Sequence, residues 1–508
     1  MSDDAAPANA PQPSLIATER ASRLAKLDHL RAANVEPYPY RFDRTHTIAE
    51  VRGEFADLEP GADTSARVSV AGRLLLIRRQ GKLVFATMRD RTGSIQLFVS
   101  KAALGDEEFA RFEELDLGDW VGVDGTVMVT KKGELSVKVS SFVLLAKCLR
   151  PLPDKWKGLT DTDTRYRQRY VDLVVNDDAR RIFDIRNSTV ASIRQTMLDR
   201  GFVEIEGPIL QLDAGGAHAR PFVTHHNALD LDMYLRIALE LHLKRLIVGG
   251  LEKVFEIGRV FRNEGIGTRH NPEFTMMESY EAFADYTDVM TLTEAIVANA
   301  ALDALGTTVI EINGRAVDLG RPFRRAKMTD LASAATGELV HPSRPADELR
   351  AIASANGVKV EPEWRPGKIV EEIFEATAEA GLIEPTFVTG HPVDVSPLAR
   401  IDRDDPLLTE RFELFIGGRE LANAYSELND PVVQRERFED EKQATAYDRD
   451  GDEGRLKTID EDYLRALEYG MPPTGGLGVG VDRLVMLLAG VTSIKEVILF
   501  PTLRPEVP

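Results

Sequence analysis

The sequence predicts an α+β protein with two folded domains, a small β-barrel followed by a larger domain in which an antiparallel sheet is flanked by helices. Three observations support this class. The chain has 508 residues, more than one hydrophobic core usually organises. Short runs of alternating apolar and polar residues, broken by glycine, fill residues 63–150. From about residue 165 onward, long helical patterns alternate with strand-like runs.

The composition argues against a membrane-embedded protein. Hydrophobic residues make up 43% and charged residues 29% of the chain, and no apolar run reaches the roughly 18 residues needed to span a bilayer. The single cysteine, Cys148, excludes an intrachain disulfide and fits a reducing compartment. We therefore expect no membrane partner and a cytoplasmic location.

The first 62 residues are expected to hold a disordered tail and a helical region. Residues 1–14 are acidic and rich in Ala and Pro, without the apolar stretch of a signal peptide. Residues 15–35 place apolar side chains at helical spacing, which predicts an amphipathic helix.

Residues 63–150 read as about five short strands with one acidic, helix-like insert after the third strand. This pattern predicts an OB-type barrel, a fold that often binds single-stranded nucleic acid by stacking bases on aromatic side chains. A turn is expected at Lys132 and Gly133.

The charge of the barrel segment differs from that of the whole chain. The formal net charge of −19 argues against a nucleic-acid partner, yet residues 65–98 hold seven basic residues and one acidic residue. These arginines and lysines equally fit a solvated face of a small barrel. The basic residues are Arg67, Arg73, Arg78, Arg79, Lys82, Arg89 and Arg91.

The second domain contains an unusual stretch at residues 261–283, FRNEGIGTRHNPEFTMMESYEAF, where charged residues lie among Phe and Met. Unpaired charges in such surroundings are costly. If the strands on either side of the loop pair as a hairpin, alternation gathers an arginine, two carboxylates and two aromatic rings on one face, which suits a ligand with a phosphate, a flat ring and an amine. A solvated strand pair is the alternative. The residues of this face are Val260, Arg262, Glu264, Phe274, Met276, Glu278 and Tyr280.

These residues resemble a known family. FRNEG and RHNPEFTMMESY resemble motif 2 of the class II aminoacyl-tRNA synthetases, GFVEIEGPIL around Pro208 resembles motif 1, and GGLGVGVDRLVMLL resembles motif 3. RPLPDKWKGL, RYRQRYVDL and ERFELFIGGRELANAYSELNDP narrow the resemblance to the bacterial-type lysyl-tRNA synthetases. The resemblance implies an OB-fold anticodon-binding domain at 63–150, a linker at 151–165 and a class II catalytic domain at 166–508.

The resemblance implies ATP as a substrate. Arg262 of motif 2 would grip the α-phosphate and Arg483 of motif 3 the γ-phosphate, and both would be catalytic. A planar, permanently charged guanidinium suits both tasks, although Arg483 also fits a helix surface. Further ATP contacts are implied at Glu264, His270, Asn271, Phe274 and Glu413.

Two glutamates are implied as Mg²⁺ ligands. A turn at Gly417 and Gly418 would pair Phe415 with Glu420, so that Glu413 and Glu420 share a face. Such a pair suits Mg²⁺, which takes a few carboxylates together with substrate phosphates. The resemblance implies up to three such ions per subunit. Without it, a solvated hairpin explains the two carboxylates equally well.

The resemblance also implies a lysine pocket whose carboxylates compensate a cationic substrate. Strict alternation would place Asn423, Tyr425 and Glu427 on the face opposite Glu420, so we predict a bulge or twist near Leu421 to Asn423. Leu239, where the family usually has proline, and His242, where it often has tyrosine, depart from the pattern. The lysine contacts are implied at Gly216, Glu240, Arg262, Glu278, Tyr280, Asn423 and Glu427.

The implied reaction is that of a lysine–tRNA ligase, in which lysine and ATP form lysyl-adenylate and tRNA(Lys) then accepts the lysyl group. In the barrel, Phe85 would stack an anticodon base, while Arg78 and Gln96 would contact the bases and phosphates. The motif around Pro208 implies a homodimer.

Three alternatives remain open. A related enzyme that lysylates a translation factor would lack the barrel. An aspartyl- or asparaginyl-tRNA synthetase shares the architecture, but the pocket glutamates favour a cationic amino acid. A non-catalytic RNA-binding protein would not be expected to keep the two arginines and the metal carboxylates.

Overall fold

The computed structural model describes residues 15–153, 159–213, 215–216, 219–320, 322–445 and 459–506. The chain divides into two compact units, Met1–Leu159 and Thr160–Pro508. The tail expected at residues 1–14 lies outside the described residues, as do residues 154–158 of the expected linker. In the part of the chain that is described, every helix is too short or too polar to cross a membrane.

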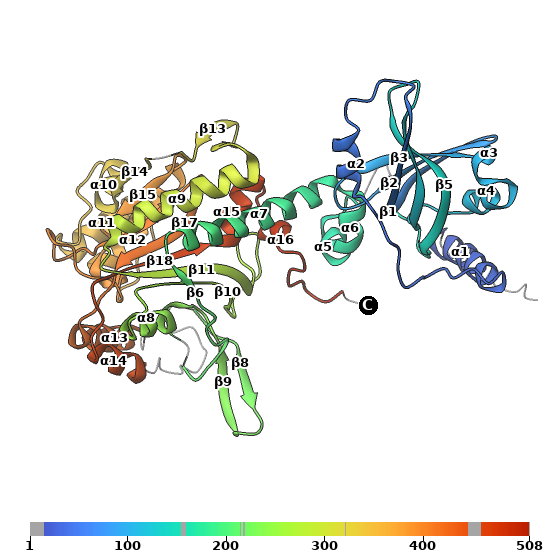
Figure 1. Ribbon diagram of the computed structural model, residues 1–508. Helices are drawn as coiled ribbons and strands as arrows, with labels where there is room; N and C mark the ends of the chain where they lie inside the picture. Colours follow the sequence, from blue (N-terminus) through green and yellow to red (C-terminus); the bar gives the residue numbers. More distant parts are fainter. Residues whose placement is uncertain are drawn as a thin grey trace, which may run out of the picture. The chain divides into compact units, whose positions relative to one another are not determined.

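The first unit contains a closed barrel with the strand order β1-β2-β3-β5-β4 (Figure 1). Neighbouring strands are antiparallel except β3 and β5, which run parallel. In β2 and β3 every second side chain is buried inside the barrel, as the alternating sequence requires. The predicted OB-type barrel is confirmed. Its strands are β1 (Asp63–Gln80), β2 (Leu83–Arg89), β3 (Ser94–Ser100), β4 (Trp120–Val129) and β5 (Leu135–Ala146).

Helices surround the barrel where the sequence predicts them. The acidic insert forms α3 (Lys101–Leu104) and α4 (Asp106–Glu113), and the predicted N-terminal helix is α1 (Leu15–Ala32). A further short helix, α2 (Ile48–Glu54), begins with a capping box formed by its Thr47 N-cap, and it buries apolar side chains in the barrel core.

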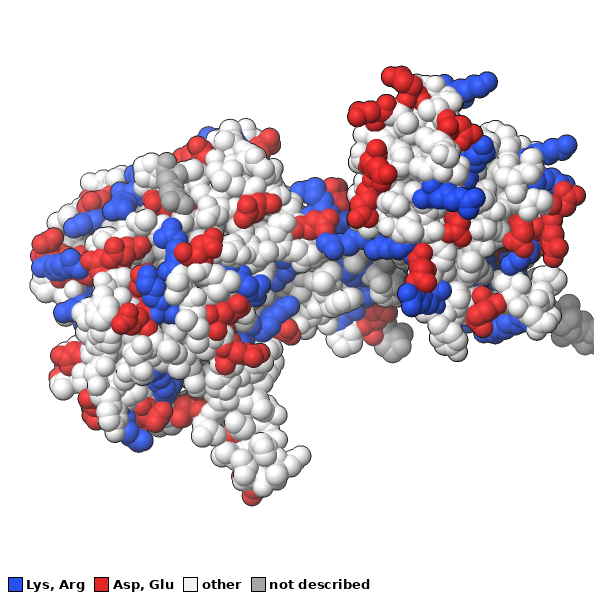
Figure 2. Space-filling view, in the orientation of Figure 1, with Lys and Arg blue, Asp and Glu red and all other residues white. Residues whose placement is uncertain are grey.

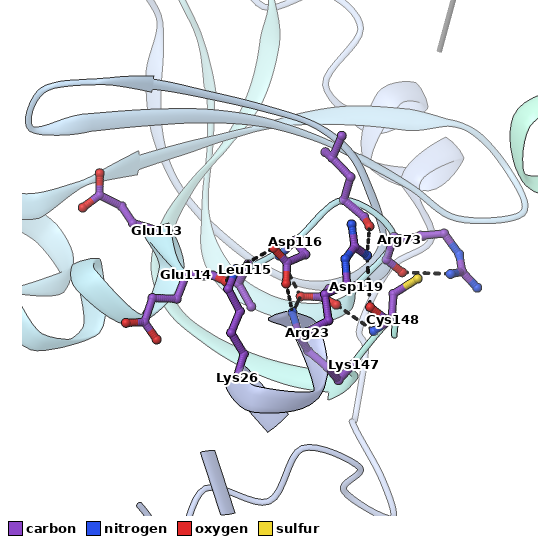
Figure 3. A network of polar contacts seen from close by, with 12 residues as sticks. Arg23, Lys26, Arg73, Glu113, Glu114, Leu115, Asp116, Asp119, Lys147 and Cys148 are labelled. Carbon is purple, nitrogen blue, oxygen red and sulfur yellow. Dashed lines mark hydrogen bonds and ion pairs between the residues drawn. The ribbon is translucent and has the colours of Figure 1, made fainter. Parts of the chain in front are cut away.

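A network of ion pairs joins α1 to the barrel (Figure 3). Arg23 donates to backbone carbonyl groups of the barrel, and Lys26 Nζ lies 2.6 Å from Asp116 Oδ1. The side chain of Lys147 is only 1% exposed, and its ammonium lies 2.5 Å from Asp116 Oδ2 and 2.7 Å from Asp119 Oδ2. Burial acts to raise the pKa of Asp116, but the hydrogen bonds from Lys147 and Lys26 hold it below its ordinary value.

The second unit is built on an eight-stranded sheet with the order β14-β15-β16-β17-β18-β11-β10-β6. All pairs from β15 to β10 are antiparallel, which confirms the predicted sheet, whereas the outermost pairs at each edge are parallel. The strands are β6 (Val203–Glu204), β10 (Lys253–Phe261), β11 (Glu273–Ala282), β14 (Arg324–Lys327), β15 (Thr386–Thr389), β16 (Arg411–Phe415), β17 (Glu420–Ser426) and β18 (Thr474–Gly480).

One face of this sheet is covered by three helices, α7 (Asp177–Asp199), α9 (Tyr286–Leu305) and α15 (Val481–Ala489) (Figure 1). Their apolar side chains pack with Phe255 and Met277 in the largest hydrophobic core. The neighbouring residues Val254 and Tyr280 belong to a separate core with α8 (Glu240–Val248) and α14 (Glu461–Glu468). Because strand side chains alternate, this second core lies on the opposite face, beside the site described below.

The remaining elements extend the second unit. Helix α5 packs within the second unit, because its residue Arg165 pairs with Asp172 and Glu496. A separate core lies under α10, α11 and α12, and a three-stranded sheet has the order β7-β9-β8. These elements are α5 (Thr162–Arg167), α6 (Arg169–Val175), β7 (Leu210–Gln211), β8 (Val223–His226), β9 (Leu231–Leu235), β12 (Val309–Ile312), β13 (Arg315–Asp318), α10 (Met328–Thr336), α11 (Ala346–Ala355), α12 (Pro366–Thr377), α13 (Pro431–Thr445) and α16 (Ile494–Val497).

Candidate active site

The strands on either side of the unusual stretch pair as predicted. In the β10–β11 hairpin Glu256 lies opposite Glu278, and Val260 lies opposite Phe274. One detail of the prediction is wrong: β10 ends at Phe261, so strand alternation does not reach Glu264, which lies in the following loop.

Arg262 nevertheless continues the pairing by one residue, because its backbone N–H donates to Pro272 O at 2.9 Å. Its guanidinium carbon lies 5.2 Å from the centroid of the Phe274 ring. Burial lowers the pKa of Arg262, and nearby carboxylates oppose this effect. The arginine is therefore a partly desolvated cation on the site face.

The β16–β17 hairpin has the predicted turn and bulge. Positive φ angles at Gly417 (64°) and Gly418 (68°) form the turn. Glu413 pairs with Asn423 and Phe415 pairs with Glu420, so Leu421 is the extra residue of a bulge. As a result Glu413, Glu420 and Asn423 share one face.

Three adjoining cavities line the site face, and the first, the Glu278 cavity, brings together every residue implied as a lysine contact. It meets the second at Arg262 and Asn423. Its acidic side chains are almost fully buried, with exposures of 5% for Glu240, 4% for Glu278 and 1% for Glu427. The implied contacts that line it are Gly216, Glu240, Arg262, Glu278, Tyr280, Asn423 and Glu427.

Glu278 has an altered acidity and lies within the lysine cavity. Burial, followed by the nearby charge of Glu240, raises the pKa of Glu278 to about 7. Its carboxylate accepts hydrogen bonds from the Leu239 N–H at 3.1 Å and from the Tyr280 hydroxyl at 3.3 Å. The departure at Leu239 therefore has a consequence, since proline has no N–H to donate.

A further charged residue, Lys244, contacts two of the carboxylates that line this cavity and was not predicted. It stands one turn after Glu240 on α8, and its side chain is fully buried. Its ammonium lies 2.5 Å from Glu240 Oε1 and is in ion-pair contact with Glu427. Burial acts to lower the pKa of Lys244, but the two carboxylates outweigh it and raise the pKa well above its ordinary value.

The second cavity, the Phe274 cavity, gathers the implied ATP contacts with one exception. Glu413 is not among its lining residues and lies instead in the third cavity, the Glu413 cavity. The second and third cavities meet at His270, Glu420 and Arg483. The implied ATP contacts in the Phe274 cavity are Arg262, Glu264, His270, Asn271, Phe274 and Arg483.

Arg483 is held at the start of a helix. Helix α15 begins directly after β18, and Arg483 Nη1 donates to the backbone carbonyl of Glu420 at 3.0 Å and to its Oε2 at 2.9 Å. The preceding residue, Asp482, is buried, accepts the Thr275 N–H at 2.6 Å and pairs with Arg186. These contacts fix the helix start on β11.

The Glu413 cavity concentrates carboxylates. Burial is the main reason why the pKa of Glu413 is raised to about 8. The charges of Glu420 and Glu371 act in the same direction, whereas Arg411, whose Nη2 donates to Glu413 at 2.6 Å, acts in the opposite direction. These three carboxylates line one cavity. Within the described ranges, no three His, Cys, Asp or Glu side chains are close enough to hold a metal ion by themselves.

The predictions missed Glu371 and Arg411. Glu371 comes from α12, which is far from the hairpin in sequence, so no local spacing indicates it. Arg411 donates both to Glu413 and, at 3.0 Å, to Asn423 Oδ1. Its position two residues before Glu413 on the same strand was the available signal.

The outer face of the barrel brings the predicted anticodon contacts together. Arg78 lies opposite Phe85, and the Phe85 ring meets Phe98 edge to face with centroids 5.5 Å apart. Gln96 donates to Ser136 Oγ at 3.0 Å. Phe98 was not predicted, although it stands two residues after Gln96 and therefore shares its face.

Comparison with known proteins matches each of the two units to a protein family. Residues 161–504 match the family described as tRNA synthetases class II (D, K and N), and residues 68–145 match the OB-fold nucleic acid binding domain. Lysine–tRNA ligases are similar over nearly the whole chain. That of Enterococcus faecalis is 52% identical, over 95% of this chain and 96% of its own length. That of Bacillus subtilis is 50% identical over the same shares, and that of Thermosynechococcus vestitus is 52% identical over 96% and 97%.

The matched segment covers more than half of the chain and contains all three cavities, and the second match covers the barrel with its aromatic pair. The chain therefore belongs to the class II tRNA synthetases, in the lysine–tRNA ligase family.

Proposed function

We propose that this protein activates L-lysine with ATP, releases pyrophosphate, and transfers the lysyl group to the 3′ end of tRNA(Lys). The observation that carries this proposal is the gathering of three buried carboxylates, Glu240, Glu278 and Glu427, in a cavity that adjoins the Phe274 cavity. Buried carboxylates suit the two ammonium groups of lysine and disfavour an acidic amino acid.

Arg262 supports the first step, because it lines both the Glu278 and the Phe274 cavities. A guanidinium there can contact the lysine carboxylate and the α-phosphate of ATP together. A carboxylate oxygen of lysine forms a bond to the α-phosphorus while the bond to pyrophosphate breaks. Orientation and charge stabilisation supply the catalysis, so no side-chain nucleophile is required.

The far end of the nucleotide would meet Arg483 and the Glu413 cavity. Arg483 is partly exposed and would exchange its contact with Glu420 for a phosphate. The mutual repulsion of Glu371, Glu413 and Glu420 makes this cavity suitable for Mg²⁺, and substrate phosphates would complete the ligand set. Bound Mg²⁺ would neutralise the charge of the departing pyrophosphate.

In the second step the 3′-hydroxyl of tRNA attacks the lysyl carbonyl carbon and AMP leaves. The barrel supports recognition of tRNA(Lys), because Phe85 and Phe98 offer half-buried rings on its outer face beside Arg78. Such rings stack unpaired bases. The single cysteine and the family suggest a cytoplasmic enzyme.

A homodimer is supported by the surface near Pro208. Large apolar side chains are exposed on the three-stranded sheet and the segment before it, and Figure 2 shows few charged residues on the β8–β9 hairpin in this view. Exposed large apolar side chains of this kind are typical of an interface. The exposed residues are Val203, Ile209, Leu210, Leu212, Val223, Leu229 and Leu231.

The proposal is tested by pyrophosphate exchange measured with each standard amino acid in turn. Exchange that depends on lysine and not on aspartate or asparagine is the expected result. Exchange with aspartate, or none with any amino acid, would overturn the proposal. Charging of tRNA(Lys) in the same preparation separates a synthetase from an enzyme that lysylates a protein.

A further inference from the structure

Lys244 contacts two of the carboxylates that line the Glu278 cavity and has no place in the proposed reaction. It is one of the largest fully buried side chains of the described part of the chain. Its ammonium touches Glu240 and Glu427, two of the three carboxylates that line the cavity. Burying a lysine ammonium in such a position costs free energy, which its ion pairs must offset.

The groups around Lys244 come from four elements. Glu240 precedes it on α8, Glu427 follows β17, and aromatic rings from β11, β17 and α14 surround the ammonium. The ring centroids of Tyr280, Tyr425 and Tyr463 lie 5.7, 5.5 and 5.9 Å from it. The Tyr425 hydroxyl donates to Glu240 at 2.9 Å. The neighbouring cation Arg245 is paired with Asp460.

The charges of this group do not balance. Three carboxylates and the Lys244 ammonium leave two negative charges for the two ammonium groups of lysine, and Arg262, which lines the same cavity, offers a positive charge to the lysine carboxylate. Among the described residues, no Lys or Arg forms an ion pair with Glu278. Oε1 of Glu427 has no hydrogen-bond partner among those residues, whereas its Oε2 is in ion-pair contact with Lys244. The cavity therefore holds carboxylate acceptors for two ammonium groups.

Lys244 also opposes the neutralisation of these acceptors. Burial raises the pKa of Glu427 well above its ordinary value, and the Lys244 ammonium acts in the opposite direction. A protonated carboxylic acid cannot form an ion pair with a substrate ammonium. Without Lys244, Glu240 and Glu427 would stand side by side with no counter-charge, which favours proton uptake.

We propose that Lys244 is a positioning residue for lysine selection, which holds the carboxylates of Glu240 and Glu427 in place so that they receive the two amines of the substrate. The inference rests on the proposed function, because it concerns the lysine-binding cavity. A purely structural lysine, needed only for folding, is the alternative.

The test is lysine affinity as a function of pH in the Lys244→Met variant, measured by calorimetry and by the KM for lysine in pyrophosphate exchange. At pH 7 the KM for lysine should rise at least about tenfold, and affinity should recover as the pH is raised. The pH of half-maximal affinity should move up by about one unit or more, since loss of an adjacent opposite charge has this effect. The KM for ATP should change little.

Three variants make the test decisive. Lys244→Arg keeps the cation and should keep the wild-type pH midpoint. Lys244→Gln keeps a hydrogen-bond donor without the charge, so it should reproduce the shift even if Lys244→Met does not fold. Lys147→Met removes an equally buried lysine with two carboxylate partners in the barrel, and it should leave the KM for lysine unchanged.

The outcomes separate the two proposals. Tighter lysine binding in Lys244→Met, or a loss of affinity that is the same at every pH, would overturn the role of Lys244. If the wild-type protein does not exchange pyrophosphate with lysine, the proposed function itself fails, whatever the variants do.

Discussion

Two buried lysines in this protein, Lys147 in the barrel and Lys244 in the second unit, each contact two carboxylates. Their side chains are 1% and 0% exposed. Around Lys147 the carboxylates are fully used, because Asp116 also binds Lys26 and Asp119 accepts the backbone N–H groups of Asp116 and Cys148 (Figure 3). Around Lys244, Glu427 Oε1 has no hydrogen-bond partner and Glu278 has no ion-pair partner within the described structure.

The pairing of the carboxylates distinguishes a structural network from a binding site of the same composition. Two lysines face two aspartates in the barrel, so nothing remains for a ligand. In the second unit, Lys244 contacts Glu240 and Glu427, and a third glutamate, Glu278, lines the same cavity without an ion pair to a described Lys or Arg. Since a buried charge is tolerated only when it is paired, the unpaired part of the second group indicates a missing cation.

We expect the largest loss of lysine-dependent activity from the substitution Glu278→Gln. It removes a carboxylate without a cationic partner from the cavity, so kcat/KM for lysine should fall by about a hundredfold or more, while the KM for ATP changes little. Pyrophosphate exchange measures both. Glu256→Gln is the matched control, because Glu256 lies opposite Glu278 and is equally buried but already pairs with Arg236 at 2.6 Å. Equal losses of lysine activity in both variants would contradict the assignment.

A second substitution tests whether the Lys147 network only stabilises the barrel. Asp119→Asn breaks a saturated, fully buried ion pair, so the free energy of unfolding of the barrel should fall by about 3 kcal/mol, while lysine-dependent exchange is kept. Denaturant unfolding followed by Trp120 fluorescence measures this change. Asp63→Asn, which breaks the exposed pair with Lys138, should cost less than about 1 kcal/mol. A loss of adenylate formation in Asp119→Asn would show that the network is more than structural.

A smaller effect is expected from Phe85→Ala on the barrel surface. Loss of one base-stacking platform should lower kcat/KM for tRNA charging by about tenfold, within the 1–3 kcal/mol usual for such rings, and should not alter adenylate formation. Charging and exchange assays on the same preparation measure the two steps. Phe85→Trp keeps an aromatic ring and should retain charging. A parallel loss of exchange in Phe85→Ala would argue for damage to folding instead.

Local sequence patterns predicted the parts of the site that depend on strand periodicity. Val260 and Phe274 face each other because both strands alternate. The bulge at Leu421 needed the family resemblance as well, because only the resemblance requires Asn423 on the face of Glu420. The parallel edge strands β6 and β14 could not be found in this way, since two to four residues carry no measurable period.

The charge chemistry of the cavity was harder to predict. A Glu and a Lys four residues apart, as at Glu240 and Lys244, are typical of a solvent-exposed helix surface, so the pattern indicates the wrong environment. Only the packing of α14 and the end of β17 over α8 buries this pair. Likewise, Glu371 reaches the Glu413 cavity from a helix that is distant in sequence.

The smallest expected effect is a pH dependence of lysine binding in the unmodified protein. Glu278 has its pKa raised to about 7 by burial, and only its ionised form can pair with an ammonium. Lysine therefore binds with release of a proton below this pH, so the KM for lysine should rise as the pH falls through 7, by at most about tenfold per unit. In Glu278→Gln this dependence should disappear. Leu239→Pro removes the N–H that stabilises the ionised carboxylate, so the midpoint should move above 7. If the midpoint stays in place in both variants, the titration belongs to another group. The charge imbalance around Lys244 would then need another explanation than an ionisable Glu278 without a cationic partner, and so would its contrast with the balanced Lys147 network.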